Sequence, residues 1–211
     1  MVDATGLPMT PTVPNQADDA APMEPIQPTL DTIRDDPEVQ AYIRATNRNL
    51  AAAGYTEHGF RHVGLVANIA RNVLRLLDYP PREQELAAIA GYLHDIGNVI
   101  SRHDHSASGA LLARPILLRH GMSWDEISTI MGAIGIHDSD GGGVAEPNSP
   151  VSAALILADK TDVHRSRVRN PDQQSFDQHD RVNYAATASF LRVHAEEHTI
   201  TLELAIDVSI A

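Results

Sequence analysis

The chain has 211 residues, of which 43% are hydrophobic, so it is long enough to bury one sizeable core. Its formal net charge of −12 argues against a nucleic acid polymer as partner, because proteins hold such polymers through phosphate contacts. The absence of cysteine excludes disulfides, thiolate nucleophiles and cysteine-ligated zinc. No segment approaches the roughly 18 apolar residues that span a membrane, so we expect a cytoplasmic protein with no membrane partner.

The N-terminal segment is rich in proline and has no apolar periodicity, which predicts a disordered tail over residues 1–36. Residues 37–185 carry helical periodicity and are expected to form one helical domain. Residues 186–211 are expected to form a C-terminal β-hairpin extension. The predicted fold class is therefore mostly α, a helical bundle followed by a hairpin.

Apolar spacing, prolines and capping residues predict the helices in chain order. The first runs from Pro37 to Gly54, and the next three cover about 58–77, 82–97 and 105–120, the last with a kink or break at Pro115. A fifth helix begins at the Ser123–Glu126 capping box and continues through Ile134. A sixth runs from Ser149 to Val163. A short helix is expected near 181–188. Alternating apolar residues then predict hairpin strands over about 189–195 and 199–208.

The sequence YLHDIGN at 92–98 places a histidine and an aspartate, His94 and Asp95, at the end of an apolar helix. Burying an ionised carboxylate there is costly unless a partner compensates it, and a divalent cation binds both imidazole and carboxylate. The alternative is an ordinary helix C-terminus, in which His94 contacts the last carbonyls and Gly97 is the C′ residue.

Residues of metal-ligand type fall on the apolar stripe of four predicted helices. They are His62, His94, His137 and Asp159, each three or four residues from an apolar neighbour of the same stripe. One buried histidine is more often a satisfied core residue than a ligand. Four helices with the same feature favour convergence on a cation, which is how helical bundles build metal sites.

In this order and context, the residues resemble the HD superfamily of metal-dependent phosphohydrolases. The motifs are HVGLVANIA from His62, LHDIGN around the doublet and LADKTD around Asp159. HSASGA from His105 and AIGIHD around His137 resemble the members with a dinuclear site. The resemblance covers about residues 55–165, and it makes residues 37–185 an HD-type metal-binding domain.

The resemblance implies two metal sites, with His94 and Asp95 at the catalytic centre. One metal would be held by His62, His94, Asp95 and Asp159, and a second by His105 and His137 with Asp95 bridging. Many dinuclear members carry another histidine directly after the position of His137, where this chain has Asp138. With nitrogen and oxygen ligands only, the cofactor is expected to be one or two divalent ions of Mn, Fe, Co, Ni or Zn.

Other residues near these motifs have competing interpretations. His58 lies one turn before His62 and is either an alternative ligand or, as we expect, a substrate-binding residue; His103 competes with His105 in the same way. Lys160 and the run Arg165, Arg167 and Arg169 are candidates for holding phosphate oxygens. The alternative for the arginines is a solvated helix end.

The expected function is hydrolysis of a small phosphorylated substrate, a phosphomonoester or phosphodiester with nucleotides among the candidates, by metal-activated water. The alternatives are a di-iron oxygenase on the same scaffold and a binding or regulatory module whose metal is structural. The hairpin edge offers a surface for a homodimer.

Overall fold

The computed structural model describes residues 27–138 and 146–209. In this part of the chain the α-helices are α1 (Leu30–Arg34), α2 (Pro37–Ala52), α3 (Phe60–Leu76), α4 (Pro81–Leu93), α5 (His105–Arg119), α6 (Trp124–Ile136), α7 (Pro150–Thr161) and α8 (Gln178–Ala185). Three short 3-10 helices, η1 (Ile96–Val99), η2 (Arg165–Arg167) and η3 (Gln173–Ser175), lie between them. Strands β1 (Ala186–His194) and β2 (Thr199–Ile206) form an antiparallel hairpin. The predicted class, a helical bundle with a C-terminal hairpin, is confirmed.

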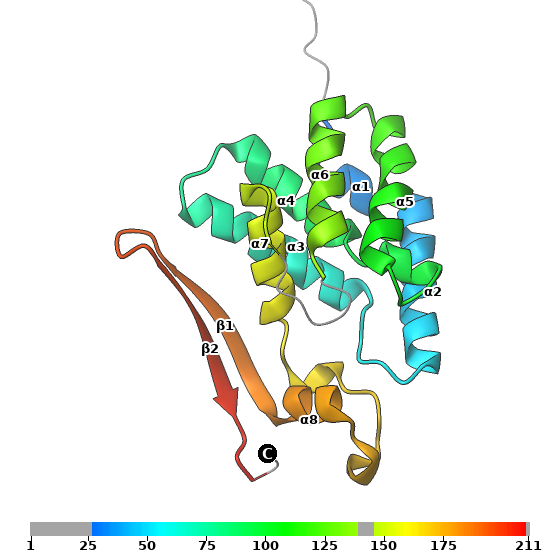
Figure 1. Cartoon of the computed structure of the whole chain (residues 1–211), viewed down its shortest axis with the longest axis vertical. Helices are drawn as coiled ribbons and strands as arrows, with labels where there is room; N and C mark the ends of the chain where they lie inside the picture. The colour runs from blue at the N-terminus through cyan, green and yellow to red at the C-terminus, as the bar shows by residue number, and fades with distance from the viewer. Residues whose placement is uncertain (1–26, 139–145, 210–211) are drawn as a thin grey trace, which may run out of the picture.

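The helices pack as a bundle around one apolar core (Figure 1). α3 packs against α4 and α7, while α5 pairs with α6, and α4 also contacts α6 and α7. The side chains between α3 and α4 are largely small: Ala67, Ala70, Ala87, Ala88 and Ala90 are fully buried. Small side chains let two helices approach closely, so this pair forms the tight centre of the bundle.

The capping residues set the helix starts as the sequence predicts. Ser123 and Glu126 form the expected capping box at the start of α6, and Pro37 and Pro150 stand in the first turns of α2 and α7. α5 continues through Pro115 as a single helix, so the predicted break does not occur there.

The predicted disordered tail ends earlier than residue 36. Leu30 and Ile33, three residues apart on α1, are fully buried in the core. Asp36 is also buried, where it caps α2 and pairs with Arg119 and His120. A single apolar pair is too short to register as periodicity, which is why the sequence pattern missed it. The rest of the predicted tail, residues 1–26, lies outside the described residues.

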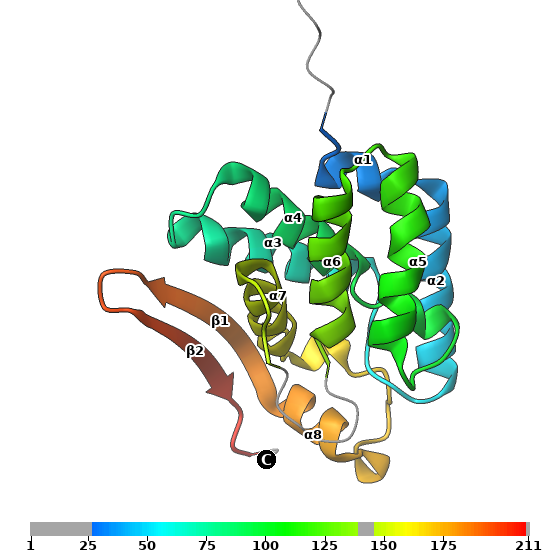
Figure 2. The ribbon, with the colours of Figure 1, turned by 45° about the horizontal axis from the view of Figure 1, so that its top comes forward.

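The hairpin extends from α8 beside α7, with β1 facing the bundle and β2 on the outside (Figures 1 and 2). Its base is held by a hydrogen bond from Ser189 Oγ to the Thr161 carbonyl, 2.6 Å. Leu191 of β1 packs against the core, whereas every residue of β2 is exposed. The pairing of this edge with a second copy stays a prediction.

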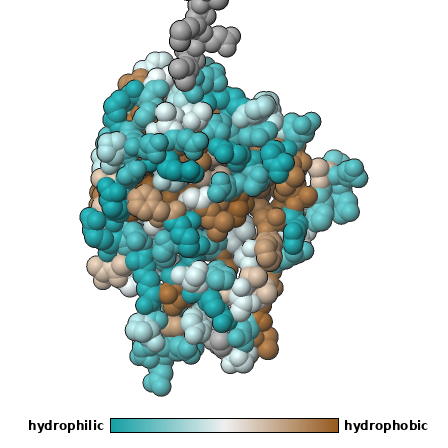
Figure 3. All heavy atoms as spheres, turned by 180° about the vertical axis from the view of Figure 1, so that it is seen from behind, coloured by the Kyte–Doolittle hydropathy of each residue, from teal (hydrophilic) through white to brown (hydrophobic). Residues whose placement is uncertain are grey.

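The surface seen from behind is largely hydrophilic, with apolar side chains gathered in a band across its middle (Figure 3). None of the described helices is long and apolar enough to cross a bilayer.

Two glycines let backbone segments approach closely near the centre of the bundle. A Cβ on Gly91 of α4 would lie 2.9 Å from Ala67 Cα of α3. A Cβ on Gly97 of η1 would overlap the carbonyl oxygen of His105 at the start of α5. By contrast, a Cβ on Gly64 of α3 would meet nothing within 4 Å. The first two positions require glycine because of packing, not because of backbone conformation.

We therefore expect Gly91→Ala and Gly97→Ala each to lower the free energy of unfolding by about 1–3 kcal/mol, through steric overlap of backbone atoms. Gly64→Ala is the matched control and should raise it by up to about 1 kcal/mol, because alanine is the better helix former. Urea denaturation followed by circular dichroism measures all three. A Gly91→Ala protein as stable as the Gly64→Ala protein would contradict this account of the α3–α4 contact.

Candidate metal centre

Six candidate ligands lie together where several helix ends meet. His62 lies in the first turn of α3, His94 caps the end of α4, Asp95 precedes η1, His105 begins α5, His137 caps the end of α6, and Asp159 lies in the last turn of α7. All except Asp159 are buried. The fold thus brings all six predicted residues into one region.

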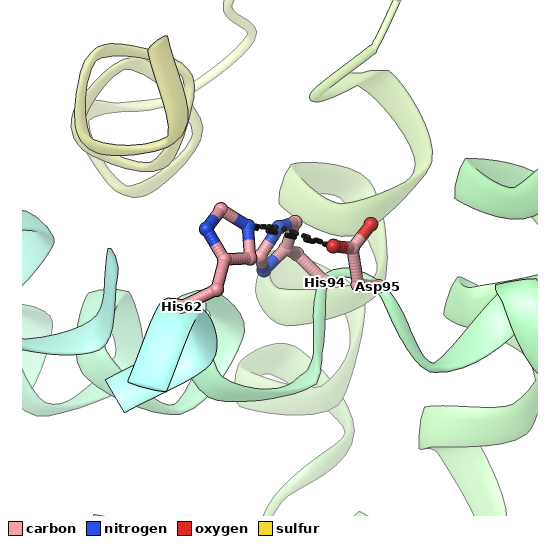
Figure 4. Close-up of side chains that lie close together, drawn as sticks. All are labelled: His62, His94 and Asp95. Atoms are coloured by element: carbon pink, nitrogen blue, oxygen red, sulfur yellow. Dashed lines mark hydrogen bonds and ion pairs between the residues drawn. The ribbon is translucent and has the colours of Figure 1, made fainter. Parts of the chain in front are cut away.

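The first cluster joins α3 to the end of α4 (Figure 4). His62 Nε2 lies 3.2 Å from His94 Nε2 and 3.4 Å from Asp95 Oδ2. His94 Nε2 lies 3.3 Å from the same Asp95 oxygen. Asp159 Oδ1 lies 3.5 Å from His62 Nε2 and 3.7 Å from His94 Nε2. Four potential ligands therefore surround one point.

The second cluster uses the other oxygen of Asp95. His105 Nε2 lies 3.2 Å from His137 Nε2 and 3.5 Å from Asp95 Oδ1. Asp138 Oδ2 lies 3.8 Å from His105 Nε2. Arg102 also reaches this cluster, with Nη1 3.2 Å from His105 Nε2. The two clusters thus share one carboxylate, one oxygen on each side.

The outer ring nitrogen of each clustered histidine is fixed by a hydrogen bond. His62 Nδ1 lies 2.7 Å from Asp162 Oδ2. In the other three rings Nδ1 faces a backbone carbonyl: His94 that of Gly91 at 2.8 Å, His105 that of Arg102 at 3.1 Å, and His137 that of Ile134 at 2.7 Å. An oxygen acceptor at Nδ1 requires the proton there, so each neutral ring directs its Nε2 lone pair inward. Lone pairs 3.2 Å apart repel each other unless a positive charge lies between them.

Asp95 adds an unsatisfied negative charge to this arrangement. Its side chain is buried, and Oδ2 has no hydrogen-bond partner among the described residues. Oδ1 accepts a hydrogen bond from Asn98 Nδ2 at 3.0 Å. Burial raises the pKa of the Asp95 carboxyl, but His94 and His62 outweigh this effect and hold the pKa well below its usual range. The carboxylate is therefore ionised, and a buried ionised oxygen without a partner is costly.

The second pair of rings is neutral at physiological pH. Burial and the nearby His94 lower the pKa of His137 to about 4. Burial also lowers the pKa of His105. Neutral imidazole is the form that binds a metal ion, so both rings are in the state that ligation requires.

Both clusters fit a divalent metal ion. Nitrogen and oxygen ligands lie about 2.0–2.2 Å from a transition metal, which places neighbouring ligands about 2.8–3.6 Å apart. The ligand atoms of His62, His94 and Asp95, and those of Asp95, His105 and His137, lie within 4.8 Å of one another in each group. Asp95 Oδ2, which has no hydrogen-bond partner among the described residues, and the facing Nε2 atoms are electron-pair donors that can coordinate a cation.

A cavity of ≈ 280 Å³ opens beside the clusters. Its charged and histidine lining in the described residues consists of His58, Asp95, Arg102, His105, His137, Asp138, Asp159, Lys160, Asp162, Arg167, Asp177, His179 and Asp180. The cavity is therefore polar, with the Asp95 carboxylate at one wall.

The structure separates the competing histidines. His58 lies outside the first cluster: Nδ1 donates to the Thr56 carbonyl at 2.8 Å, and Nε2 accepts from Arg167 at 3.2 Å. Burial lowers the pKa of His58 to about 4, so the ring is neutral. His103 is exposed, whereas His105 enters the second cluster. The geometry favours His62 and His105 as the ligands and leaves His58 as a cavity wall.

The four predicted phosphate-binding cations differ in position, and Arg167 lines the cavity whereas Arg169 does not. Lys160 lines the cavity, with Nζ 3.1 Å from Asp159 Oδ2. Arg165 does not line it: the guanidinium pairs with Asp207 at 3.3 Å and stacks on the Tyr184 ring. The expectation for Arg165 is therefore corrected, because the chain leaves the helix after Thr161 and η2 turns this side chain toward the hairpin.

Three features of the site were missed by sequence reasoning. Asp162 fixes His62 and forms a bidentate pair with Arg61, 3.1 and 2.8 Å. Its position three residues after Asp159 was the available signal. Arg102, and the residues of α8 that line the cavity, carried no such signal because they come from irregular or distant segments.

A family model of the HD domain matches residues 59–163. Among solved structures, the chain is similar to a predicted HD superfamily hydrolase from an uncultured Thermotogales bacterium, at 23% identity and a TM-score of 0.47, covering 60% of this chain and 67% of that one. No curated protein matches the chain. The matched segment begins just before α3 and ends just after α7, and it contains all six clustered residues. Residues 59–163 are an HD domain, and through it this chain belongs to the HD superfamily.

Proposed function

We propose that this protein is a metal-dependent phosphohydrolase that cleaves a phosphomonoester or phosphodiester, with nucleotides among the candidate substrates. The observation that carries the proposal is the position of Asp95 between two pairs of imidazoles, with one oxygen toward each pair. A carboxylate shared in this way is suited to bridge two metal ions, the arrangement with which many phosphoester hydrolases clamp both reacting oxygens.

The residues divide between two metal positions. His62, His94, Asp95 and Asp159 would hold one ion, and Asp95, His105 and His137 would hold the other. When bound, a divalent ion lowers the pKa of water and neutralises phosphoryl oxygens, which supplies the nucleophile and the Lewis acid that phosphoester hydrolysis needs. With imidazole and carboxylate ligands and no sulfur, Mn, Fe, Co, Ni and Zn remain the candidate metals.

Asp138 supports the second position in place of the histidine that many dinuclear members carry. Its Oδ2 lies 3.8 Å from His105 Nε2, within reach of a shared ion. Arg102 donates to Asp138 at 3.3 Å and also contacts His105 Nε2, so its guanidinium competes with a metal ion for that nitrogen. We therefore expect the second position to bind metal more weakly than the first.

The cations beside the clusters supply the phosphate-binding side of the site. Lys160 and Arg102 both line the cavity and are partly exposed, with 57% and 40% of their side chains accessible. Each is paired with Asp138 or Asp159, at the edge of the metal positions. A phosphate held by the metal ions would meet these two cations, while the neutral His58 ring forms a wall beside it.

Asp162 is proposed to orient His62 as a metal ligand. It accepts the Nδ1 proton of His62 and is itself held by Arg61. Such carboxylate–histidine–metal arrangements fix the ring and raise its basicity. Asp162 would therefore act through His62, without contact to the reacting atoms.

Replacing Asp95 with alanine is expected to abolish both metal retention and phosphatase activity, because the variant lacks the ligand common to both clusters. Elemental analysis of purified protein and hydrolysis of p-nitrophenyl phosphate with added Mn²⁺ measure the two effects. Glu196→Ala, in the exposed hairpin turn, is the control. A fully active Asp95→Ala protein would refute the site, and di-iron absorption and spin-resonance signals in the wild type would favour the oxygenase alternative.

Replacing His137 with alanine is expected to remove the second ion and spare the first, because His137 contributes only to the second cluster. The measurement is metal atoms per chain after dialysis against a fixed Mn²⁺ concentration. The expected value falls from two toward one. Unchanged stoichiometry in the variant would contradict the dinuclear form of the proposal.

The Asp162→Asn variant is expected to bind metal about 10–100-fold more weakly, as is typical when the residue behind a histidine ligand is changed. Isothermal titration calorimetry with Mn²⁺ gives the affinity of the first position. A thermal melt of the metal-free variant separates misfolding from loss of orientation. Unaltered affinity in a folded Asp162→Asn protein would show that His62 needs no such support.

A further inference from the structure

The cavity has two chemically different ends. One part of the lining consists of the metal clusters with Arg102 and Lys160, and another part comes from α8, which lies beyond the ends of α6 and α7 (Figures 1 and 2). α8 contributes Asp177, His179, Asp180 and Asn183 to the lining. A substrate bound at the metal end must therefore place its remaining part against α8.

Asp180 is the distinctive residue of this second end. It is only 5% exposed, and its side chain has no hydrogen bond or ion pair with any residue that the structure describes. Its backbone N–H donates to Asp177 Oδ1 at 2.8 Å, but its carboxylate does not return the bond that would complete a capping box. Asp180 instead lines the cavity. A buried carboxylate without a protein partner is costly unless a ligand supplies hydrogen-bond donors.

The neighbours of Asp180 are already committed. Asn183 donates to the His179 carbonyl at 2.9 Å and accepts from the His164 backbone at 3.3 Å. Arg167 donates to the Asp162 and Glu57 carbonyls, so its guanidinium is already occupied by protein acceptors. Asp180 is therefore the buried side chain at this end whose polar atoms remain available to a ligand, among the residues that the structure describes.

Charge decides which part of a phosphoester lies there. Asp177 and Asp180 would repel a phosphate at the α8 end, whereas Arg102, Lys160 and metal ions attract it at the other. The alcohol part of the substrate therefore points toward Asp180. The Asp180 carboxylate can accept hydrogen bonds from hydroxyl groups on that part, and an ammonium group is the alternative partner that the experiment below distinguishes.

From this geometry, and resting on the proposed phosphohydrolase function, we infer that Asp180 selects phosphoesters whose alcohol part carries free hydroxyl groups, as sugar-like and polyol phosphates do. The carboxylate accepts hydrogen bonds from these hydroxyls, which is how carboxylates recognise paired hydroxyls on sugars. An ester of a purely apolar alcohol would leave the carboxylate buried without a partner, and it would bind more weakly.

Phosphonates, whose P–C bond is not hydrolysed, test this inference by binding alone. The full chain loaded with Mn²⁺ is titrated calorimetrically with propylphosphonate, 2,3-dihydroxypropylphosphonate and 3-aminopropylphosphonate. We expect the wild type to bind the dihydroxy compound about tenfold more tightly than propylphosphonate, as a charge-assisted hydrogen bond allows. Asp180→Ala should remove this preference, and Asp180→Asn, which still accepts a hydrogen bond, should retain about threefold.

The Glu196→Ala control should bind all three compounds as the wild type does. Asp180→Ala should bind propylphosphonate at least as tightly as the wild type, because the apolar ligand no longer leaves a buried carboxylate without a partner, and this binding shows that fold and metal site are intact. A tenfold preference that survives in Asp180→Ala overturns the inference, as does tightest binding of the aminopropyl compound, which would assign an ammonium group to this end. If no phosphonate binds to the metal-loaded wild type, the proposed phosphohydrolase function fails as well, and the two failures are thereby distinguished.

Discussion

The carboxylate of Asp95 is buried between two pairs of imidazoles, and the organisation of the site depends on compensating its charge. The Nε2 atoms of each pair face each other at 3.2 Å, with a carboxylate oxygen 3.3–3.5 Å away. Burial alone would lower the pKa of His62, but the nearby Asp162 and Asp95 carboxylates outweigh it and raise the pKa to about 9. The surroundings of His62 therefore favour a positive charge at this position. A divalent ion supplies that charge and satisfies the other lone pairs at the same time.

The bundle is built so that helix ends, not helix faces, meet at this point. His94 and His137 cap α4 and α6, where their Nδ1 atoms satisfy carbonyls of the last turn. The same hydrogen bonds fix the rings for ligation, so helix termination and metal binding use one set of contacts. The close approaches at Gly91 and Gly97 bring α3 and α5 near enough to α4 and η1 for the shared carboxylate to reach both clusters.

The six residues that the sequence singles out lie together in the structure, and each has a local signal in the sequence. Apolar stripes place His62, His94, His137 and Asp159 on inward faces of regular helices, and the HD motifs add His105 and Asp95. Gly97 shows what the sequence could not predict. The sequence allows it to be a C′ glycine, but its backbone is not left-handed. Glycine is needed there because a Cβ would overlap the His105 carbonyl oxygen. That contact joins residues brought together only by tertiary packing.

The errors fall where the chain is irregular. Helical spacing gives no direction for side chains after Thr161, so it could not show that Arg165 faces Asp207 and the hairpin while Arg167 enters the cavity. α8 is separated from α7 by two short 3-10 helices, and its place below the cavity has no counterpart in any periodic pattern. The metal-binding end of the site is thus encoded locally, whereas the substrate-facing end is encoded by the path of the chain.

The charge of the cavity links these two ends. In its described lining, six aspartates stand against three lysine and arginine side chains, in a chain whose net charge is already −12. Such a cavity repels a phosphorylated ligand until cations occupy it, because like charges in a partly buried site are weakly screened. Under the proposed function, metal ions are therefore a condition for substrate binding as well as for hydrolysis. Under the same proposal, the aspartates on the α8 side of the cavity would repel the phosphate and direct it toward the metal positions.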